Sequence, residues 1–195
     1  MNQKHDREKV VKTGLSLFCS KGYSSLGIDE ICKTTGMTKG AFYNAFKSKE
    51  SFLLETISKY GQMTVIRLNK QLNHKNAKAV DRLQAFYENM FLVQPKNNYT
   101  GCMINNMMSE LGTTNNLVSA ATAIEFEHFL DVLEPCVKEA QNDGDLNPTI
   151  DSRALAELLH ATFYGALTRA KSLQEYTNGI ETMNLLINSL KTIKT

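Results

Sequence analysis

The amino-acid sequence predicts an all-α protein. Apolar residues recur at three- and four-residue intervals through most of the 195-residue chain, which is the spacing of one face of an α-helix. Only three prolines occur, and no long run alternates apolar and polar residues as a half-buried β-strand would. We expect about nine helices, arranged as a short N-terminal helix-turn-helix unit followed by a larger helical body.

The composition is that of an ordinary globular protein, with 42% hydrophobic and 22% charged residues. No apolar run approaches the roughly 20 residues that a membrane-spanning helix needs, and the N-terminal segment lacks the apolar core of a signal peptide. The four cysteines are widely spaced, without the clustered ligands of a zinc site. We therefore expect a cytoplasmic protein with reduced thiols, no metal, no cofactor and no membrane partner.

The first helix is predicted over residues 7–21. One apolar stripe is formed by Val10 or Val11, Gly14 or Leu15, and Phe18, which recur at three- to four-residue intervals. Gly22 follows the last turn and is well placed to end the helix in the left-handed conformation. We expect this helix to pack its stripe against the two helices that follow.

Residues 28–46 predict two short helices joined by a tight turn. Ile28 and Ile31 give the first of them an apolar edge, and Gly36 is suited to end it. Thr38 is a good N-cap for the second, because its hydroxyl can accept a hydrogen bond from an unpaired helix N–H. Two helices joined by a turn containing glycine are typical of the helix-turn-helix, whose second helix lies in the DNA major groove.

Ser48 begins a fourth helix that we expect to run to about residue 73, with Glu50 in its first turn. We place the domain boundary here, with a helix-turn-helix domain over residues 1–48 and a larger helical domain over residues 49–195. A helix that starts beside the DNA-binding unit and ends in the body is a plausible lever between the two.

Five further helices are predicted in the body from apolar periodicity. A loop that contains a proline and two asparagines separates the first two of them. Pro135 lies inside the third and is expected to kink or split it. The predicted ranges are 78–93, 101–111, 116–142, 151–172 and 178–193.

The last two of these helices carry the strongest apolar patterns of the body. Ala161 and Gly165 lie one turn apart and are small enough to let another helix approach closely. The pattern permits either an internal helix pair or a four-helix dimer interface, with two helices from each subunit related by a two-fold axis. The helix-turn-helix favours the dimer, because two half-sites one helical turn apart require two reading helices. The predicted interface residues are Leu155, Leu158, Leu159, Thr162, Phe163, Ala166, Met183, Ile187 and Leu190.

A set of N-terminal residues stands in an order and spacing typical of one protein family. These residues are Arg7, Phe18, Gly22, Tyr23, Ile28, Ile31, Gly36, Lys39, Gly40, Tyr43, Phe46, Lys49, Glu50 and Leu53. Through them the chain resembles the TetR family of bacterial repressors. The resemblance is specific over residues 7–57, whereas the body resembles the family in helix number and length only. It implies that residues 1–48 form a DNA-binding domain and residues 49–195 a ligand-binding and dimerisation domain.

The resemblance implies a homodimeric repressor that binds a palindromic operator in double-stranded DNA and leaves it when a small-molecule effector enters the body. Hydroxyls, lysine ammonium groups and helix N-terminal N–H groups are the usual phosphate contacts. The residues implied to contact DNA are Thr38, Lys39, Gly40, Ala41, Tyr43, Asn44 and Lys49. Two residues depart from the family pattern. Gly14 stands where alanine is usual, which is expected to weaken the first helix by up to ~1 kcal/mol, and Gly27 replaces a capping Ser or Thr.

Residues 101–110 are similar to a segment of a TetR subgroup that includes electrophile- and quinone-responsive repressors. Cys102, in the first turn of the predicted helix, would feel the positive end of its dipole, which favours the reactive thiolate. The alternative is a buried, structural cysteine packed among methionines, with an apolar effector bound non-covalently between helices. The candidate ligand or sensor residues are Cys102, Met103, Asn106, Met107, Phe126, Phe129 and Phe163.

The charge distribution and the motifs separate three function classes. Residues 1–60 carry ten Lys and Arg against six Asp and Glu, a net charge of +4, whereas the remainder carries −2, which suits a polyanion partner at one end. A thiol enzyme would need Cys102 with His128 or His160 as base. No phosphate loop or nucleophile elbow supports it, and no catalytic residue is predicted. A helical interaction protein is the third class, and salt-sensitive binding to promoter DNA would separate the regulator from both. The sign of regulation stays open, because a repressor and an activator share these features.

Overall fold

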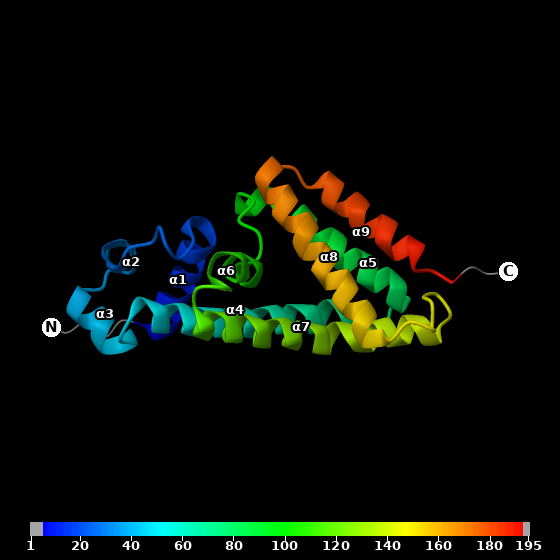
Figure 1. Cartoon of the computed structure of the whole chain (residues 1–195), viewed down its shortest axis with the longest axis horizontal. Helices are drawn as coiled ribbons and strands as arrows, with labels where there is room; N and C mark the ends of the chain where they lie inside the picture. Colours follow the sequence, from blue (N-terminus) through cyan, green and yellow to red (C-terminus); the bar gives the residue numbers. More distant parts are fainter. Residues whose placement is uncertain (1–5, 193–195) are drawn as a thin grey trace. The chain divides into compact units, whose positions relative to one another are not determined.

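The structure is a computed structural model that describes residues 6–192, and within that range it contains nine α-helices and no β-strand (Figure 1). One short 3₁₀ turn, Pro95–Asn97, lies between the fifth and sixth helices. In chain order the helices are α1 (Arg7–Lys21), α2 (Ile28–Thr35), α3 (Lys39–Phe46), α4 (Lys49–Leu72), α5 (Ala79–Leu92), α6 (Met103–Leu111), α7 (Asn116–Asn142), α8 (Ser152–Leu173) and α9 (Thr177–Ser189). The all-α prediction and the predicted number of helices are confirmed.

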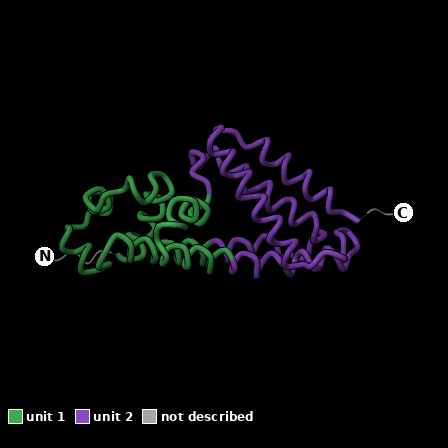
Figure 2. Tube along the Cα trace, viewed as in Figure 1, with its two compact units in different colours: residues 1–63, 102–126 green, residues 64–101, 127–195 purple. Residues whose placement is uncertain are grey.

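The described chain packs as two compact units (Figure 2). The first unit comprises the residues up to 63 together with residues 102–126, and the second comprises residues 64–101 together with residue 127 onward. Packing therefore groups α6 and the first part of α7 with the helix-turn-helix. The boundary after residue 48 is a functional division between DNA binding and the body, and it stays a prediction.

The ends of the N-terminal helices follow the local signals in the sequence. Gly22 and Gly36 end α1 and α2 with positive φ angles of 76° and 73°, a region that glycine enters without steric cost. The Thr38 hydroxyl accepts a hydrogen bond from the Ala41 N–H at 3.1 Å and caps α3. Gly27 gives α2 no side-chain cap, as the sequence indicated.

A cluster of four buried phenylalanines forms the core of the helix-turn-helix. The ring of Phe52, on α4, lies 5.7 Å from that of Phe18, 5.4 Å from that of Phe42 and 4.6 Å from that of Phe46, measured between centroids. Such tilted and edge-on pairs combine large apolar burial with favourable ring geometry. This cluster fixes α3 against α1 and α4, and so sets which face of α3 is left exposed.

Gly14 has a packing role that the sequence did not reveal. A Cβ built at this position would lie 2.3 Å from Cζ of Phe52, a ring that other phenylalanines surround. The glycine therefore gives up some helix propensity so that α1 and the Phe52 ring can approach closely. The expected weakening of α1 is offset by this contact.

The second unit is held by α5, α8 and α9 around an aromatic cluster. Tyr87 and Phe91 of α5 each place their ring 5.4 Å from that of Phe163 on α8. Gly179 of α9 allows close approach there, because a Cβ at this position would lie 2.2 Å from the Phe91 ring. The apolar stripes of α8 and α9 are thus used inside the protomer, at least in part.

Three helix predictions differ from the structure in detail. Pro135 lies on the exposed side of α7 and does not split it, since the helix is continuous, while the kink that was the other expected outcome stays a prediction. The helix predicted from residue 101 begins at Met103. The last helix ends at Ser189 rather than near residue 193, which lies outside the described residues.

Candidate nucleic-acid interface

One face of α3 is exposed and polar, and the opposite face is buried. Phe42 and Phe46 point inward and are 0% and 3% exposed. Tyr43, by contrast, is 46% exposed, a high value for an aromatic side chain. The exposed residues of α3 and its N-cap are Thr38, Lys39, Gly40, Tyr43 and Asn44.

Five of the seven residues predicted to contact DNA therefore share one exposed surface. Gly40 leaves open space beside the helix, since no atom of the described residues lies within 4 Å of a Cβ built there. Ala41 is only half-buried and borders the same surface. A helix of this kind, with a free N-terminal end and hydroxyl and ammonium groups around it, can contact phosphates and base edges.

Lys39 forms an ion pair that the sequence did not indicate. Its Nζ lies 2.6 Å from Oδ1 of Asp29 on α2, and both side chains are well exposed. The hydrogen bond to Asp29 raises the pKa of Lys39 above its ordinary value. Because the pair is exposed, a phosphate can compete with the carboxylate for the ammonium group.

Lys47 is a further cation on this surface that sequence reasoning missed. It directly follows α3, is exposed, and has a positive φ of 66° at the C-cap. Its ammonium group donates to the Asn44 carbonyl at 3.3 Å. A lysine immediately after the predicted recognition helix was the available signal.

Lys49 makes contacts within its own chain that the sequence did not indicate, and its phosphate contact stays a prediction. Its Nζ donates to the carbonyls of Tyr23 at 2.9 Å and Leu26 at 3.0 Å. It also lies 4.0 Å from the centroid of the Tyr23 ring, a cation–π distance. The ammonium group is thus bonded to the loop between α1 and α2. Lys49 therefore also helps to hold together helices α1–α3 and the start of α4, which we call the DNA reader.

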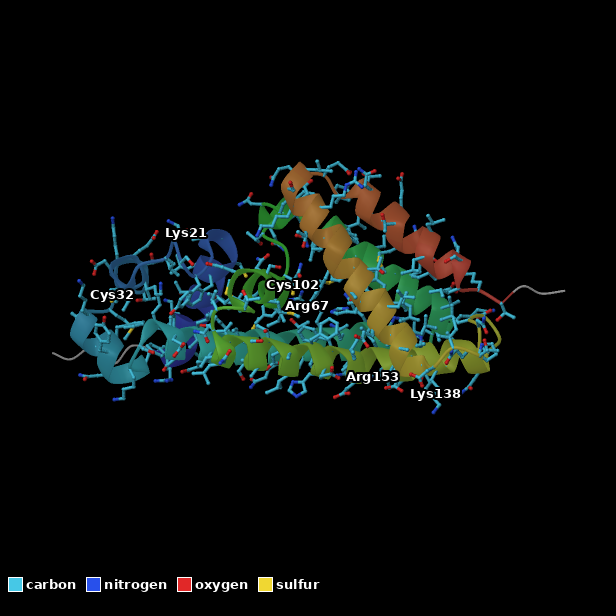
Figure 3. All side chains as sticks on the ribbon, viewed as in Figure 1. Lys21, Cys32, Arg67, Cys102, Lys138 and Arg153 are labelled. Carbon is cyan, nitrogen blue, oxygen red and sulfur yellow. The ribbon has the colours of Figure 1, made fainter. Side chains whose placement is uncertain are left out.

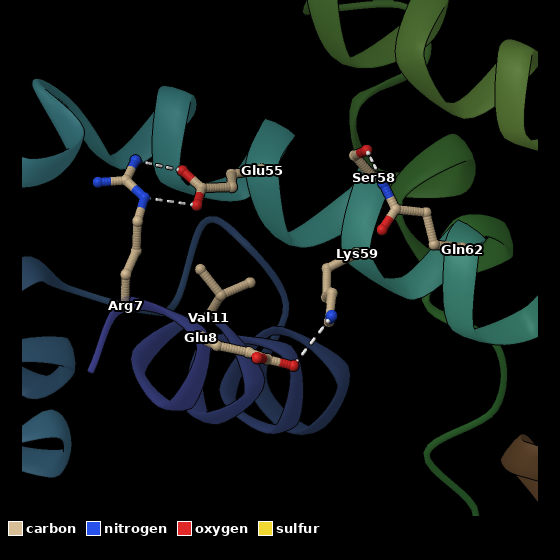
Figure 4. Close-up of a pocket in the computed structure, with 7 residues that line it drawn as sticks. All are labelled: Arg7, Glu8, Val11, Glu55, Ser58, Lys59 and Gln62. Atoms are coloured by element: carbon tan, nitrogen blue, oxygen red, sulfur yellow. Dashed lines mark hydrogen bonds and ion pairs between the residues drawn. The ribbon is translucent and has the colours of Figure 1, made fainter.

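Arg7 connects three of the N-terminal helices, and Figure 4 shows its contact with Glu55. Its guanidinium donates to both carboxylate oxygens of Glu55 on α4, at 2.8 Å and 2.5 Å, and to the Ala45 carbonyl of α3 at 2.9 Å. It lies 4.5 Å from the centroid of the Phe46 ring. A bidentate guanidinium has more fixed geometry than a lysine, so Arg7 positions the C-terminal end of α3.

The candidate sensor residues of the first unit are mostly buried. Cys102 is 5% exposed and is the N-cap of α6, one residue before its first turn (Figure 3). The Tyr60 hydroxyl donates a hydrogen bond to its Sγ at 3.4 Å. Met103 and Met107 are fully buried, while Asn106 and Phe126 are half-buried.

The other two candidate ligand residues lie in the second unit. Phe129 and Phe163 are each 1% exposed, and their rings lie 5.8 Å and 5.6 Å from that of His160. Burial lowers the pKa of His160 to about 3, so this imidazole is neutral at pH 7. The two phenylalanines are part of an aromatic core around a neutral histidine.

The predicted dimer residues divide into two groups. Leu155, Leu159, Phe163, Met183 and Ile187 are at most 1% exposed and pack inside the protomer, so a second copy cannot reach them. Leu158 is 45% exposed, and Thr162, Ala166 and Leu190 are half-buried. Sequence periodicity found the apolar faces of α8 and α9 but did not separate their inner sides from their outer sides.

Within residues 6–192, no group of three or more His, Cys, Asp or Glu side chains is arranged to hold a metal ion. No helix in that same part of the chain is long and apolar enough to cross a lipid bilayer.

Comparison with known proteins identifies relatives for both parts of the chain. Residues 10–56 match the family described as bacterial regulatory proteins, tetR family, and residues 79–183 match the one described as Tetracyclin repressor-like, C-terminal domain. The repressor DhaR of Mycobacterium sp. (strain GP1) is 27% identical over 165 residues, which cover 85% of this chain and 82% of DhaR. The regulator AcuR of Cereibacter sphaeroides is 30% identical over 165 residues, which cover 84% of this chain and 75% of AcuR.

Solved structures share this fold. A regulatory protein TetR from Rhodobacter sphaeroides superposes with a TM-score of 0.87 at 26% identity, covering 95% of this chain and 98% of its own. The reduced form of NemR from E. coli has a TM-score of 0.83 at 22% identity, covering 97% and 98%. The relatives named here are transcription regulators, and the exposed helix α3 lies inside the matched N-terminal segment.

Proposed function

The chain belongs to the TetR family of bacterial transcription regulators, and from that premise we propose which of its residues contact the operator, which face joins two copies, and how an effector acts. The protein is a helix-turn-helix regulator, and its relatives include repressors. The observation that carries the residue assignment is the exposed polar face of α3, set by the buried phenylalanines behind it.

In this assignment α3 enters the major groove, with its capped N-terminus toward the phosphates. Tyr43 and Asn44 face base edges or sugar, and Lys39 reaches a phosphate after leaving Asp29. Lys47 joins this set as a further phosphate contact. We retain Thr38, Gly40 and Ala41 at the N-terminal end, where main-chain N–H groups and a small side-chain volume permit close approach.

Lys39→Ala is expected to weaken binding of all DNA sequences alike and to reduce the salt slope of log affinity by about 1, because one phosphate contact is lost. The measurement is fluorescence anisotropy of a duplex selected by the wild-type protein, and of a scrambled duplex, across a salt series. Lys70→Ala, an exposed lysine of α4, is the matched control and should leave the slope unchanged. A loss confined to one base position would make Lys39 a base reader instead.

Two copies are proposed to meet through the outer sides of α8 and α9. The exposed positions there include two large apolar side chains, Leu158 at 45% and Leu185 at 73% exposure. Ala161 and Gly165, in the middle of α8, are exposed like Leu158 and follow it at helical spacing. Their small size favours the close approach of another helix. Thr162, Ala166 and Leu190 border this face. An isologous dimer of this kind sets the spacing of two reading helices.

For the effector, we propose that modification of the Cys102 thiol releases DNA. The Tyr60 hydroxyl donates a hydrogen bond to Sγ, the atom that a thiol-reactive reagent would modify. Since Cys102 is 5% exposed, a reagent reaches it only when the start of α6 opens. The alternative assigns Cys102 to packing beside Met103 and Met107, with an apolar effector bound non-covalently.

Cys102→Ser is expected to retain operator binding and to lose its response to a thiol-reactive probe such as N-ethylmaleimide, because serine does not form the thioether. The measurement is operator binding before and after treatment, with adduct sites located by mass spectrometry. Cys136→Ser is the matched control, since burial raises the pKa of that thiol to about 11 and leaves it unreactive at pH 7. If the Cys102→Ser protein still leaves DNA on treatment as wild type does, the thiol mechanism is wrong and the non-covalent effector is favoured.

A further inference from the structure

The loop between α1 and α2 is held by two side chains of opposite charge. The Glu110 carboxylate of α6 accepts hydrogen bonds from the backbone N–H groups of Tyr23, at 2.9 Å, and Ser24, at 2.7 Å. Lys49 donates to the carbonyls of Tyr23 and Leu26. The peptide groups of this loop are therefore bonded through both their donors and their acceptors.

The Glu110 contact is closely fitted. Burial acts to raise the pKa of this carboxyl, but the N–H groups of Tyr23 and Ser24 outweigh it and hold the pKa below its ordinary value. Gly22 stands at the start of the loop with φ +76°, and a Cβ built there would lie 2.7 Å from Oε2 of Glu110. The carboxylate thus packs directly against backbone, at a position where a side chain would displace it.

This loop sets the path of the chain from the end of α1 to the start of α2. Leu26, at its end, is 0% exposed and lies one residue before the N-cap of α2. The N-cap itself, Gly27, makes no side-chain hydrogen bond, so the start of α2 lacks a local restraint of its own. The charge-assisted bonds from Glu110 and Lys49 supply that restraint from outside the helix.

A second polar contact joins the α6–α7 connection to the same unit. The Asn115 side-chain amide donates to Oε1 of Glu50 in the first turn of α4, at 2.5 Å. Asn115 also caps α7, since its Oδ1 accepts from the Val118 N–H. The C-terminal part of α6 and the loop after it are therefore bonded at two places to the N-terminal helices α1–α4. Of these two contacts in the described chain, the one made by Glu110 reaches the backbone of the α1–α2 loop, and the one made by Asn115 reaches a side chain of α4.

We propose that Glu110 is a positioning residue for DNA reading, through which α6 holds α2 and α3 in the arrangement that fits the operator. It lies on α6 rather than on the recognition helix, and it acts through backbone N–H groups of the α1–α2 loop. The inference rests on the proposed function, because it assumes that α3 reads DNA. Since α6 begins directly after Cys102, a shift of this helix carries the carboxylate with it.

The test compares full-length wild type with Glu110→Gln and Glu110→Asp. Glutamine keeps the side-chain volume but removes the charge, and its NH₂ group would face one of the two backbone N–H groups that the carboxylate now accepts from. Aspartate keeps the charge, but its side chain is one methylene shorter. Glu88→Gln, an exposed residue of α5, is the matched control for loss of one charge. For each protein we measure the affinity for the operator and for a scrambled duplex, and the salt slope of binding. Circular dichroism gives the helicity, and hydrogen exchange is followed at residues 22–27.

Both Glu110 variants are expected to bind the selected operator about tenfold or more weakly, because two hydrogen bonds to a charged group are lost. Their salt slope and their affinity for scrambled DNA should equal those of wild type, because no phosphate contact is removed. Hydrogen exchange should increase at residues 22–27 without loss of helicity. The proposal is overturned if the Glu110→Gln protein binds the operator within about twofold of wild type, or if the Glu110→Asp protein behaves like wild type. A general loss of helicity would also overturn it. Wild type that binds no DNA selectively would instead refute the proposed function itself.

Discussion

Replacement of Phe52 with alanine is expected to lower the free energy of unfolding by about 3–5 kcal/mol and to abolish operator binding. The Phe52 ring is 0% exposed and contacts three other phenylalanine rings from α1 and α3. Its removal leaves a cavity at the point where these helices meet, and it also removes the ring that Gly14 accommodates. Urea unfolding and anisotropy with the selected operator measure the two effects.

Tyr43→Ala is the matched control for Phe52→Ala, because it also removes an aromatic ring from the helix-turn-helix. Tyr43 is 46% exposed, so its loss should change stability by less than about 1 kcal/mol while still weakening DNA binding. A Phe52→Ala protein with the stability of wild type would show that the phenylalanine cluster is not what holds α3 in place.

Gly165→Phe is expected to convert the protein to monomers and to weaken operator binding about a hundredfold or more, since a monomer loses the gain from two linked half-sites. Gly165 is exposed, and apart from its chain neighbours and the backbone of its own helix, no atom of the described residues lies within 4 Å of a Cβ built there, so a side chain can extend into solvent from the isolated protomer. Phenylalanine also has higher helix propensity than glycine. The added volume therefore acts on the proposed dimer rather than on the fold, and sedimentation with circular dichroism separates the two.

Ala123→Phe adds a ring of the same kind at an exposed position of α7 and serves as the control. It should leave both oligomeric state and operator affinity unchanged. A Gly165→Phe protein that remains dimeric would place the contact between copies on a face other than the outer side of α8 and α9.

Much of the DNA reader could be predicted because its signals are local. The glycines that end α1 and α2, the Thr38 cap and the apolar spacing of α3 each act within one or two helical turns. These features indicated where the two short helices begin and end, and the order of residues around them indicated the family. The predicted ends of α1 coincide with those observed.

The contacts that sequence reasoning missed depend on partners far away in sequence. Lys49 is predicted to contact a phosphate because it is a lysine beside a helix start, and the structure adds that its ammonium group is bonded to carbonyls of the α1–α2 loop. The inner residues of α8, such as Leu159, have the same periodicity as outer ones such as Leu158, and only burial distinguishes them. Periodicity identifies an apolar stripe but not which neighbour covers each side of it.

By itself, then, the sequence determined the all-α class, the helix-turn-helix and its exposed recognition helix, because helix propensity, capping and periodicity are encoded over a few residues. Only the tertiary structure decided that Gly14 makes room for the Phe52 ring, that Arg7 and Lys49 hold the reader together, and that Glu110 bonds the α1–α2 loop from α6. Those contacts join residues tens of positions apart. They form only when the helices pack, since packing brings a charged side chain within reach of a backbone group that no local pattern pairs with it.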